Sequence, residues 1–307
     1  MIAKVFGVGG IGTGIFFHLH EDRTLTRDES RPGRLMDYKD YCKGHIILHY
    51  VSVLTQNIEV YAIGMLGRDS QGEALRAEMQ SAGIDTRFVE VTDEARTMFS
   101  VCYQYPDGSG GNITTSNSAG SLVSPAFIDR CTDGIDENSL VLAAPEVPLA
   151  GRIRLLEIAK ERKAFTVSSF LAEEAAAFEE AGGLALSDLI SINEAEAVAA
   201  GGIEEITRKI SLVNPALKLI VTAGGKGSYL LENGDISHIA AIPAEIKSTA
   251  GAGDAFLGGT IAGLVSNMSF FQAASHGAAA AYFAVTDENT IAKGLTREKM
   301  EGLAGGL

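Results

Sequence analysis

Residues 248–256, which read STAGAGDAF, bring glycines, hydroxyls and an aspartate together in one short segment. Glycines allow tight turns that aim consecutive N–H groups at one anion, and the helix predicted to follow adds the positive end of its dipole. Asp254, in the first turn of that helix, can accept a proton from a hydroxyl, while Gly251, Ala252 and Gly253 form an anion hole for a transferring phosphoryl group. The alternative is a helix that merely begins with glycines and carries an aspartate.

Two further motifs each follow an apolar, strand-like run. They are Asn193 and Glu196 (N-x-x-E) after residues 188–192, and Thr222, Gly224 and Gly227 (T-x-G-x-x-G) at the end of residues 219–223. In an open parallel sheet, ligands bind beyond the carboxyl ends of the strands. We therefore expect all three motifs to face the same crevice.

The elements that position these motifs alternate along the chain. Apolar and β-branched runs predict strands at 2–8, 58–66, 139–145, 164–169, 188–192 and 219–223. Between them, the sequence predicts helices at 70–83, 152–162, 172–182 and 204–213. Strands that alternate with helices indicate right-handed βαβ units and a mostly parallel sheet covered by helices.

Two segments, residues 12–45 and 96–118, interrupt this alternation. Polar and apolar residues alternate there and turn signals appear, which predicts antiparallel strands. A small sheet inserted twice would lie at one edge of the main sheet, as a lid over a cleft. The sequence thus predicts one α/β domain over residues 1–307 with a lid.

The composition excludes several classes of partner. The formal net charge is −14, whereas nucleic-acid phosphates require a basic footprint. Cys42, Cys102 and Cys131 are far apart and fit no metal-ligand spacing, so they are interpreted as reduced thiols. No signal peptide is indicated, and the longest weakly polar run, 249–265, contains Asp254. We expect a cytoplasmic protein that binds neither nucleic acid nor membranes.

The glycines near the N-terminus raise a different hypothesis. Gly7, Gly9 and Gly12 spell G-x-G-x-x-G after a strand-like run, as in dinucleotide-binding loops. Such a loop needs a helix next and then a strand that ends in an acidic residue, whereas residues 15–34 are strand-like and then turn-rich. A nicotinamide-dependent dehydrogenase is therefore disfavoured. Residues 223–228, AGGKGS, also fail the spacing of a Walker loop.

The order and spacing of the motifs resemble the ribokinase-like, or PfkB, family of carbohydrate kinases over nearly the whole chain. Five segments carry the resemblance: IGMLGRDSQGEALRAEMQSAGIDT (63–86), APEVPL (144–149), INEAEA (192–197), VTAGGKGSYL (221–230) and STAGAGDAF (248–256). The last is the most specific. The resemblance implies a three-layer α/β/α ribokinase-like fold with a small β-sheet lid.

The resemblance also implies roles for individual residues. Asp254 would deprotonate the acceptor hydroxyl, and Gly251, Ala252 and Gly253 would surround the γ-phosphate of ATP. Asn193 and Glu196 would lie near the phosphates, with Glu196 ordering Mg²⁺ through water. The residues expected to line the nucleotide are Thr222, Gly224, Gly227 and, on the helix at 277–285, Ala278. Glu146 matches a glutamate that approaches the sugar in some members.

The predicted acceptor site departs from the family pattern. Most members carry Asn-x-Asp after the first strand, and its aspartate binds sugar hydroxyls. In this chain the two positions fall on Gly10 and Gly12, or on Gly12 and Gly14 if the alignment shifts by two residues, so no carboxylate is present. A second sugar motif, two glycines followed by an asparagine, is reduced to Lys43, Gly44 and a histidine, and Ile46, Ile47 and Leu48 stand where the asparagine is expected. Gly10, Gly12 and Gly44 therefore mark an unusual acceptor site.

Other departures concern cations and histidines. Ser248 stands where many relatives have the aspartate that holds a monovalent cation, which weakens the expectation of K⁺ activation. The histidines of this part of the chain are His18 and His20, expected on one strand face, and His45 and His49, expected on one helix face. Polar lining or surface histidines are the simpler interpretation, with a metal site as the alternative.

These observations leave three hypotheses. The first is an ATP-dependent phosphotransferase that acts on a hydroxyl of a small sugar-like acceptor. The second is a nucleoside kinase of the same family, and the third is a kinase-like protein that binds a nucleotide or metabolite without turnover. The resemblance further implies that a homodimer through the lid is possible.

Overall fold

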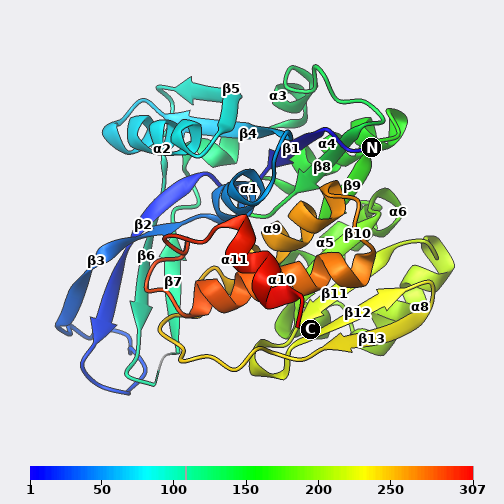
Figure 1. Ribbon diagram of the computed structural model, residues 1–307. Coiled ribbons are helices and arrows are strands. Elements are labelled where there is room, and N and C mark those ends of the chain that lie inside the picture. The colour runs from blue at the N-terminus through cyan, green and yellow to red at the C-terminus, as the bar shows by residue number, and fades with distance from the viewer. Residues whose placement is uncertain (108, 307) are drawn as a thin grey trace.

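The computed structural model describes residues 1–107 and 109–306, and Gly108, inside the predicted lid segment 96–118, lies outside them. A nine-stranded sheet forms its centre (Figure 1). In spatial order the strands are β13 (Asp235–Ile239), β12 (Ser228–Glu232), β11 (Lys218–Thr222), β10 (Leu189–Asn193), β9 (Phe165–Ser168), β8 (Ser139–Ala143), β1 (Lys4–Val8), β4 (Glu59–Gly67) and β5 (Ile84–Thr92).

The central sheet is parallel from β5 to β11, and β12 and β13 extend it as an antiparallel hairpin. Its middle strands carry buried apolar residues on both faces, which is the pattern of a parallel sheet between two helical layers. The carboxyl ends of β10 and β11 lie in register, with Asn193 paired to Thr222. Two of the predicted motifs thus begin side by side.

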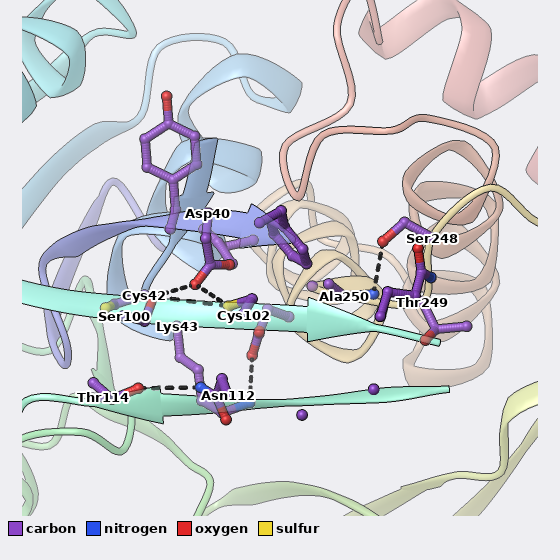
Figure 2. Close-up of a pocket in the computed structure, with 18 of the residues that line it drawn as sticks. Asp40, Cys42, Lys43, Ser100, Cys102, Asn112, Thr114, Ser248, Thr249 and Ala250 are labelled. Atoms are coloured by element: carbon purple, nitrogen blue, oxygen red, sulfur yellow. Dashed lines mark hydrogen bonds and ion pairs between the residues drawn. The ribbon is translucent and has the colours of Figure 1, made fainter. Parts of the chain in front are cut away.

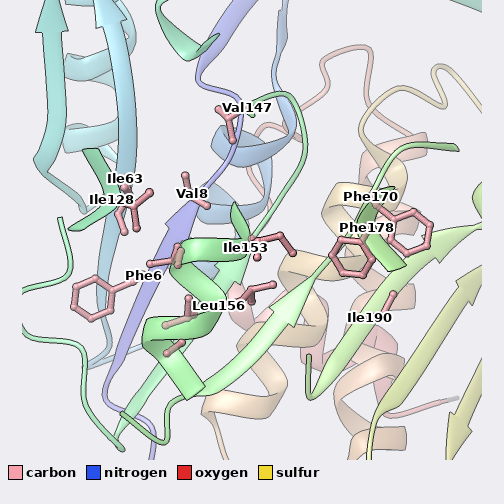
Figure 3. Packing of buried hydrophobic residues seen from close by; sticks show 14 of the residues in the cluster. Phe6, Val8, Ile63, Ile128, Val147, Ile153, Leu156, Phe170, Phe178 and Ile190 are labelled. Atoms are coloured by element: carbon pink, nitrogen blue, oxygen red, sulfur yellow. The ribbon is translucent and has the colours of Figure 1, made fainter. Parts of the chain in front are cut away.

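Helices cover both faces of this sheet. Over one face, apolar residues of α3, α4, α5 and α8 pack into a single cluster, part of which Figure 3 shows around Phe6, Ile153 and Phe178. Over the other face pack α1, α2, α9 and α10. The helices are α1 (Lys43–Leu54), α2 (Ser70–Ser81), α3 (Pro125–Asp129), α4 (Leu149–Glu161), α5 (Ala175–Glu180), α6 (Gly183–Leu186), α7 (Glu194–Ala199), α8 (Ile203–Val213), α9 (Ala252–Val265), α10 (Phe270–Val285) and α11 (Arg297–Ala304).

A second, four-stranded sheet lies beside the central sheet, at the lower left of Figure 1. Its order is β3 (Gly33–Tyr41), β2 (Gly12–Leu19), β6 (Met98–Gln104) and β7 (Gly110–Thr114). We call it the lid sheet. The β2–β3 and β6–β7 pairs are antiparallel as predicted, but β2 and β6 pair in parallel. The antiparallel prediction thus holds within each segment, while the parallel contact joins the two segments, because β2 and β6 directly follow the parallel strands β1 and β5.

The predicted three-layer architecture and mostly parallel sheet are confirmed. All six predicted strands are present, with ends displaced by one or two residues. The helix predicted at 172–182 is instead a 3₁₀ turn, Ala172–Glu174, followed by α5, and α4 begins three residues before its predicted start. Among residues 1–107 and 109–306, no helix has both the length and the apolar character needed to cross a membrane.

Candidate active site

Asp254 lies in the first turn of α9, directly after the glycine-rich turn. Gly251 is the residue before the helix and has φ 76°, a left-handed conformation that favours glycine. A Cβ atom at this position would lie 2.8 Å from the carbonyl oxygen of Thr290, so the close packing of the turn also requires glycine. The sequence thus produces a tight turn directly before α9, so the N–H groups of the turn lie next to the positive end of the helix dipole.

Lys43, the first residue of α1, faces Asp254. Its Nζ lies 3.6 Å from Asp254 Oδ1, and the Asp254 side chain is only 14% exposed. Burial raises the pKa of Asp254, and the ammonium of Lys43 acts in the opposite direction. The carboxylate of Asp254 in turn raises the pKa of Lys43. The pair therefore places a largely buried carboxyl group, the candidate base, beside one positive charge.

Glu146 forms a second carboxylate next to this pair. Its Oε2 accepts a hydrogen bond from the backbone N–H of Lys43 at 2.8 Å, and its backbone has a left-handed φ of 71°. Burial raises the pKa of Glu146 to about 7, against the lowering effect of Lys43. A Cβ atom at Gly10 would lie 2.3 Å from Glu146 Oε2. The glycine at position 10 therefore makes room for this carboxylate.

Three cavities meet around Asp254. The first, of about 310 Å³, lies between the lid sheet and α1 and is the candidate acceptor cavity (Figure 2). The second, of about 50 Å³, is lined by Asn193, Glu196 and Thr222. The third, of about 480 Å³, lies between the β12–β13 hairpin and α10. Asp254 lines the first two cavities, Gly253 the last two, and Thr249 the first and third.

The small central cavity contains a reciprocal pair of hydrogen bonds. Asn193 Oδ1 accepts the N–H of Glu196 at 2.9 Å, and Glu196 Oε2 accepts the N–H of Asn193 at 2.8 Å, which caps α7. Burial raises the pKa of Glu196. No described residue donates a hydrogen bond to Glu196 Oε1, so this oxygen can receive a water or a cation.

The third cavity has a largely apolar wall that fits a nucleotide base. The predicted residues Thr222, Gly224, Gly227 and Ala278 all line it. Gly227 has φ 94°, and a Cβ atom there would lie 2.1 Å from the carbonyl oxygen of Ile239. This glycine therefore allows the loop after β11 to pack against the hairpin that walls the cavity.

The structure brings most of the predicted site residues together, but not the glycines expected at the acceptor. Gly10, Gly12 and Gly44 are buried and do not line the acceptor cavity. They pack behind its wall. A Cβ atom added at Gly44, for example, would lie 2.7 Å from the backbone of Gly9. Side chains from elsewhere, including Asp40, Lys43 and Glu146, form the wall instead.

Sequence reasoning gave no role to Lys43 or Asp40. The only signal for Lys43 was a basic residue beside Gly44 in a strongly acidic chain. Asp40 lies in the lid segment, and its partners Ser100 and Cys102 are about sixty residues away in the sequence. Their proximity depends on strand pairing within the lid sheet.

The predicted histidine cluster does not form a metal centre in the described residues, where no three His, Cys, Asp or Glu side chains are placed to hold an ion. His45 and His49 lie on α1 with ring centroids 6.3 Å apart. Burial lowers the pKa of His45 to about 3. His18 lies at the end of β2, and His20 follows it on the surface.

Residues 47–297 match the sequence profile described as pfkB family carbohydrate kinase. The chain belongs to this family. A curated ribokinase of Haemophilus influenzae is 25% identical over 253 residues, covering 78% of this chain and 80% of that protein. This pfkB family member is therefore an ATP-dependent carbohydrate kinase.

Solved structures of the same fold include a ribokinase of Arabidopsis thaliana complexed with ribose and ATP, with a TM-score of 0.76 and 20% identity over 99% of each chain. A nucleoside kinase of Burkholderia thailandensis in complex with inosine has a TM-score of 0.79 and 15% identity, covering 98% of this chain and 97% of its own. At these identities the likeness shows the fold of the pfkB kinase and no more.

Proposed function

We propose that this kinase transfers the γ-phosphoryl group of ATP to a hydroxyl of a small, uncharged sugar-like acceptor, with Asp254 as the base. The observation that carries the proposal is the position of Asp254, on the boundary between the acceptor cavity and the central cavity. A hydroxyl in the first cavity and a phosphoryl group in the second would meet at this carboxylate. Proximity of this kind supplies a large part of the rate in phosphoryl transfer.

The environment of Asp254 suits a base. Burial raises its pKa, which makes it a stronger proton acceptor, while Lys43 acts in the opposite direction and favours the ionised form. As the proton leaves the acceptor hydroxyl, the N–H groups at the start of α9 can stabilise the negative charge that develops on the phosphoryl oxygens. Gly253 lines both the central cavity and the third cavity, the proposed nucleotide cavity, which supports an anion hole at their junction.

The central cavity also fits Mg²⁺. Glu196 offers one carboxylate oxygen that accepts no hydrogen bond from the described residues, and carboxylate oxygens and water are the ligands that Mg²⁺ prefers. We propose that Glu196 holds the ion through water, as the resemblance implied. When bound, Mg²⁺ neutralises charge on the phosphates of ATP.

The charge of the acceptor cavity argues for an uncharged acceptor. The charged side chains that line it are Asp40, Lys43, Glu146 and Asp254. Among the described residues that form this wall, Lys43 is the single basic one, and Asp254 already faces it. Phosphorylated or carboxylated sugars would place a further negative charge beside these carboxylates, which is unfavourable in a partly buried site. The inosine-bound neighbour keeps nucleosides as the second candidate.

Replacement of Asp254 by asparagine tests the mechanism. We expect Asp254→Asn to slow phosphoryl transfer by about 10²–10⁴-fold, because the amide cannot accept the proton. Binding of a non-hydrolysable ATP analogue, measured by calorimetry, should remain within a few-fold of wild type. Asp235→Asn, on the exposed edge strand β13, is the matched control and should leave both quantities unchanged. Transfer by Asp254→Asn at the wild-type rate would overturn the assignment.

An acceptor screen distinguishes phosphoryl transfer from binding without turnover. ADP release is followed with ATP and each of a panel of pentoses, hexoses, polyols and nucleosides, and the shift in unfolding temperature is measured in parallel. We expect at least one acceptor to be phosphorylated. A ligand that raises the unfolding temperature while the whole panel gives no ADP release would favour the binding protein.

A further inference from the structure

The absence of side chains at Gly10 and Gly14 leaves space that two carboxylates from other segments occupy. Glu146 lies against Gly10, as described above. On β2, Gly14 pairs with Asp40 of β3 on one side and with Ser100 of β6 on the other. A Cβ atom at Gly14 would lie 2.1 Å from Ser100 Oγ and 3.1 Å from Asp40 Cβ. Asp40 and Ser100 can therefore meet across β2 only because residue 14 is glycine.

The contacts of Asp40 fix one of its oxygens and leave the other available. Oδ2 accepts hydrogen bonds from Ser100 Oγ and, at 3.1 Å, from Cys102 Sγ. Among the described residues, none donates a hydrogen bond to Oδ1. The residue is only 8% exposed and lines the acceptor cavity, where Figure 2 shows it opposite Ser248 and Thr249. Oδ1 is not among the buried polar atoms of the described residues that lack a partner, so it reaches the cavity, where a ligand or water can donate a hydrogen bond to it.

We propose that Asp40 binds the acceptor, with Oδ1 accepting hydrogen bonds from acceptor hydroxyls that are not phosphorylated. This inference rests on the proposed function and identifies the group that replaces the carboxylate missing at positions 10, 12 and 14. The lid sheet then supplies the carboxylate that holds the acceptor. Ser100 and Cys102 act as positioning residues because they orient the carboxylate.

Steady-state kinetics of Asp40→Asn test this assignment. D-Ribose, D-fructose and inosine serve as acceptor probes, and kinetics follow for whichever is phosphorylated fastest. We expect the KM for the acceptor to rise about ten- to a hundredfold, because a hydrogen bond to a charged group is lost. The KM for ATP should stay within about twofold, since Asp40 does not line the nucleotide cavity.

Two further variants keep the result interpretable. Asp107→Asn makes the same chemical change at an exposed turn of the lid sheet outside the acceptor cavity and should leave both KM values unchanged. Ser100→Ala removes one donor that orients Asp40, so it should raise the acceptor KM by a smaller factor, and it serves as the test should Asp40→Asn not fold. The unfolding temperature without ligands is measured for each variant.

The outcomes separate this inference from the proposed function. Phosphorylation by wild type together with an unchanged acceptor KM in Asp40→Asn would overturn the role of Asp40 and leave Asp254 untouched. An equal rise in both KM values, with a lower unfolding temperature, would show that Asp40 only supports the lid sheet. If wild type phosphorylates none of the three probes and no member of the wider panel, the proposed function fails, and the role of Asp40 fails with it.

Discussion

At the scale of single residues, the protonation of Asp254 depends on the balance between its burial and the charges around it. Burial raises the pKa of Asp254 and Lys43 lowers it, so the two effects decide the pH below which the proposed base is protonated. Glu146, with a pKa near 7, and Glu196, whose pKa is also raised, show that burial disfavours charge throughout this site. Lys43 is the counter-charge for all three carboxylates.

Replacement of Lys43 by methionine should shift the acid limb of the rate profile. Without the ammonium, the pKa of Asp254 rises further, so the base is protonated at a higher pH. Activity requires the ionised form and is lost as the pH falls through this pKa. We expect the acid limb of kcat against pH to move to higher pH in Lys43→Met, with a lower plateau. A profile that is lower at every pH but unshifted would show that Lys43 does not tune Asp254.

At the scale of elements, glycines allow the lid strands and α1 to approach closely. At Gly12, the first residue of β2, a Cβ atom would lie 2.7 Å from both Cys42 Sγ and the Met98 carbonyl oxygen. The glycine run that resembles a dinucleotide loop therefore serves packing between the central sheet and the lid sheet. Its letters match the fingerprint, but a strand and not a helix follows it.

Substitution of this glycine should destabilise the fold. We expect Gly12→Ala to lower the free energy of unfolding by about 1–3 kcal/mol, because the methyl group meets the Met98 carbonyl oxygen, a backbone atom that cannot easily move, and the buried Cys42 Sγ. Gly302→Ala is the matched control, since it lies on the exposed face of α11 and an added methyl group there would meet no other atom within 4 Å. It should stabilise by up to about 1 kcal/mol through helix propensity. Chemical denaturation of both variants measures the difference, and equal effects would contradict the packing argument.

The sequence predicted those parts of the molecule that depend on neighbours in the chain. Apolar runs located the strands, and a glycine-rich turn before a small-residue helix located Asp254. Asp40 could not be found in this way, because its role depends on β3, β2 and β6 lying side by side. Lys43 likewise faces Asp254 across more than two hundred residues of sequence, a contact that no local pattern encodes.

At the scale of the whole molecule, the lid sheet presents two different faces. Asp40, Ser100 and Cys102 face the acceptor cavity. The row of paired residues on the other face contains the apolar Ile15, Val101 and Ile113 together with Lys39, and Ile113 is 73% exposed. An exposed apolar sheet face commonly marks an interaction surface. We propose that a second copy of the chain covers this face, which is the homodimer that the resemblance implied.

Sedimentation of wild type and Ile113→Lys tests this dimer. We expect wild type to sediment as a dimer at micromolar concentration and Ile113→Lys as a monomer, because a charge cannot be buried in an apolar interface without a partner. Val198→Lys on α7, at another exposed apolar residue outside the lid sheet, is the control and should remain dimeric. A monomeric wild type would contradict the proposal directly.

The small size of the central cavity has a consequence for how the enzyme uses ATP. At about 50 Å³, it has room for only a few water molecules, and for fewer once a phosphoryl group occupies it. Water that attacks the phosphoryl group would approach through the acceptor cavity, on the side where Asp254 stands. A bound acceptor displaces that water and takes its place as nucleophile. If phosphoryl transfer proceeds as proposed, hydrolysis and transfer compete for the same position, and we expect the supply of acceptor to decide how much ATP is hydrolysed without product.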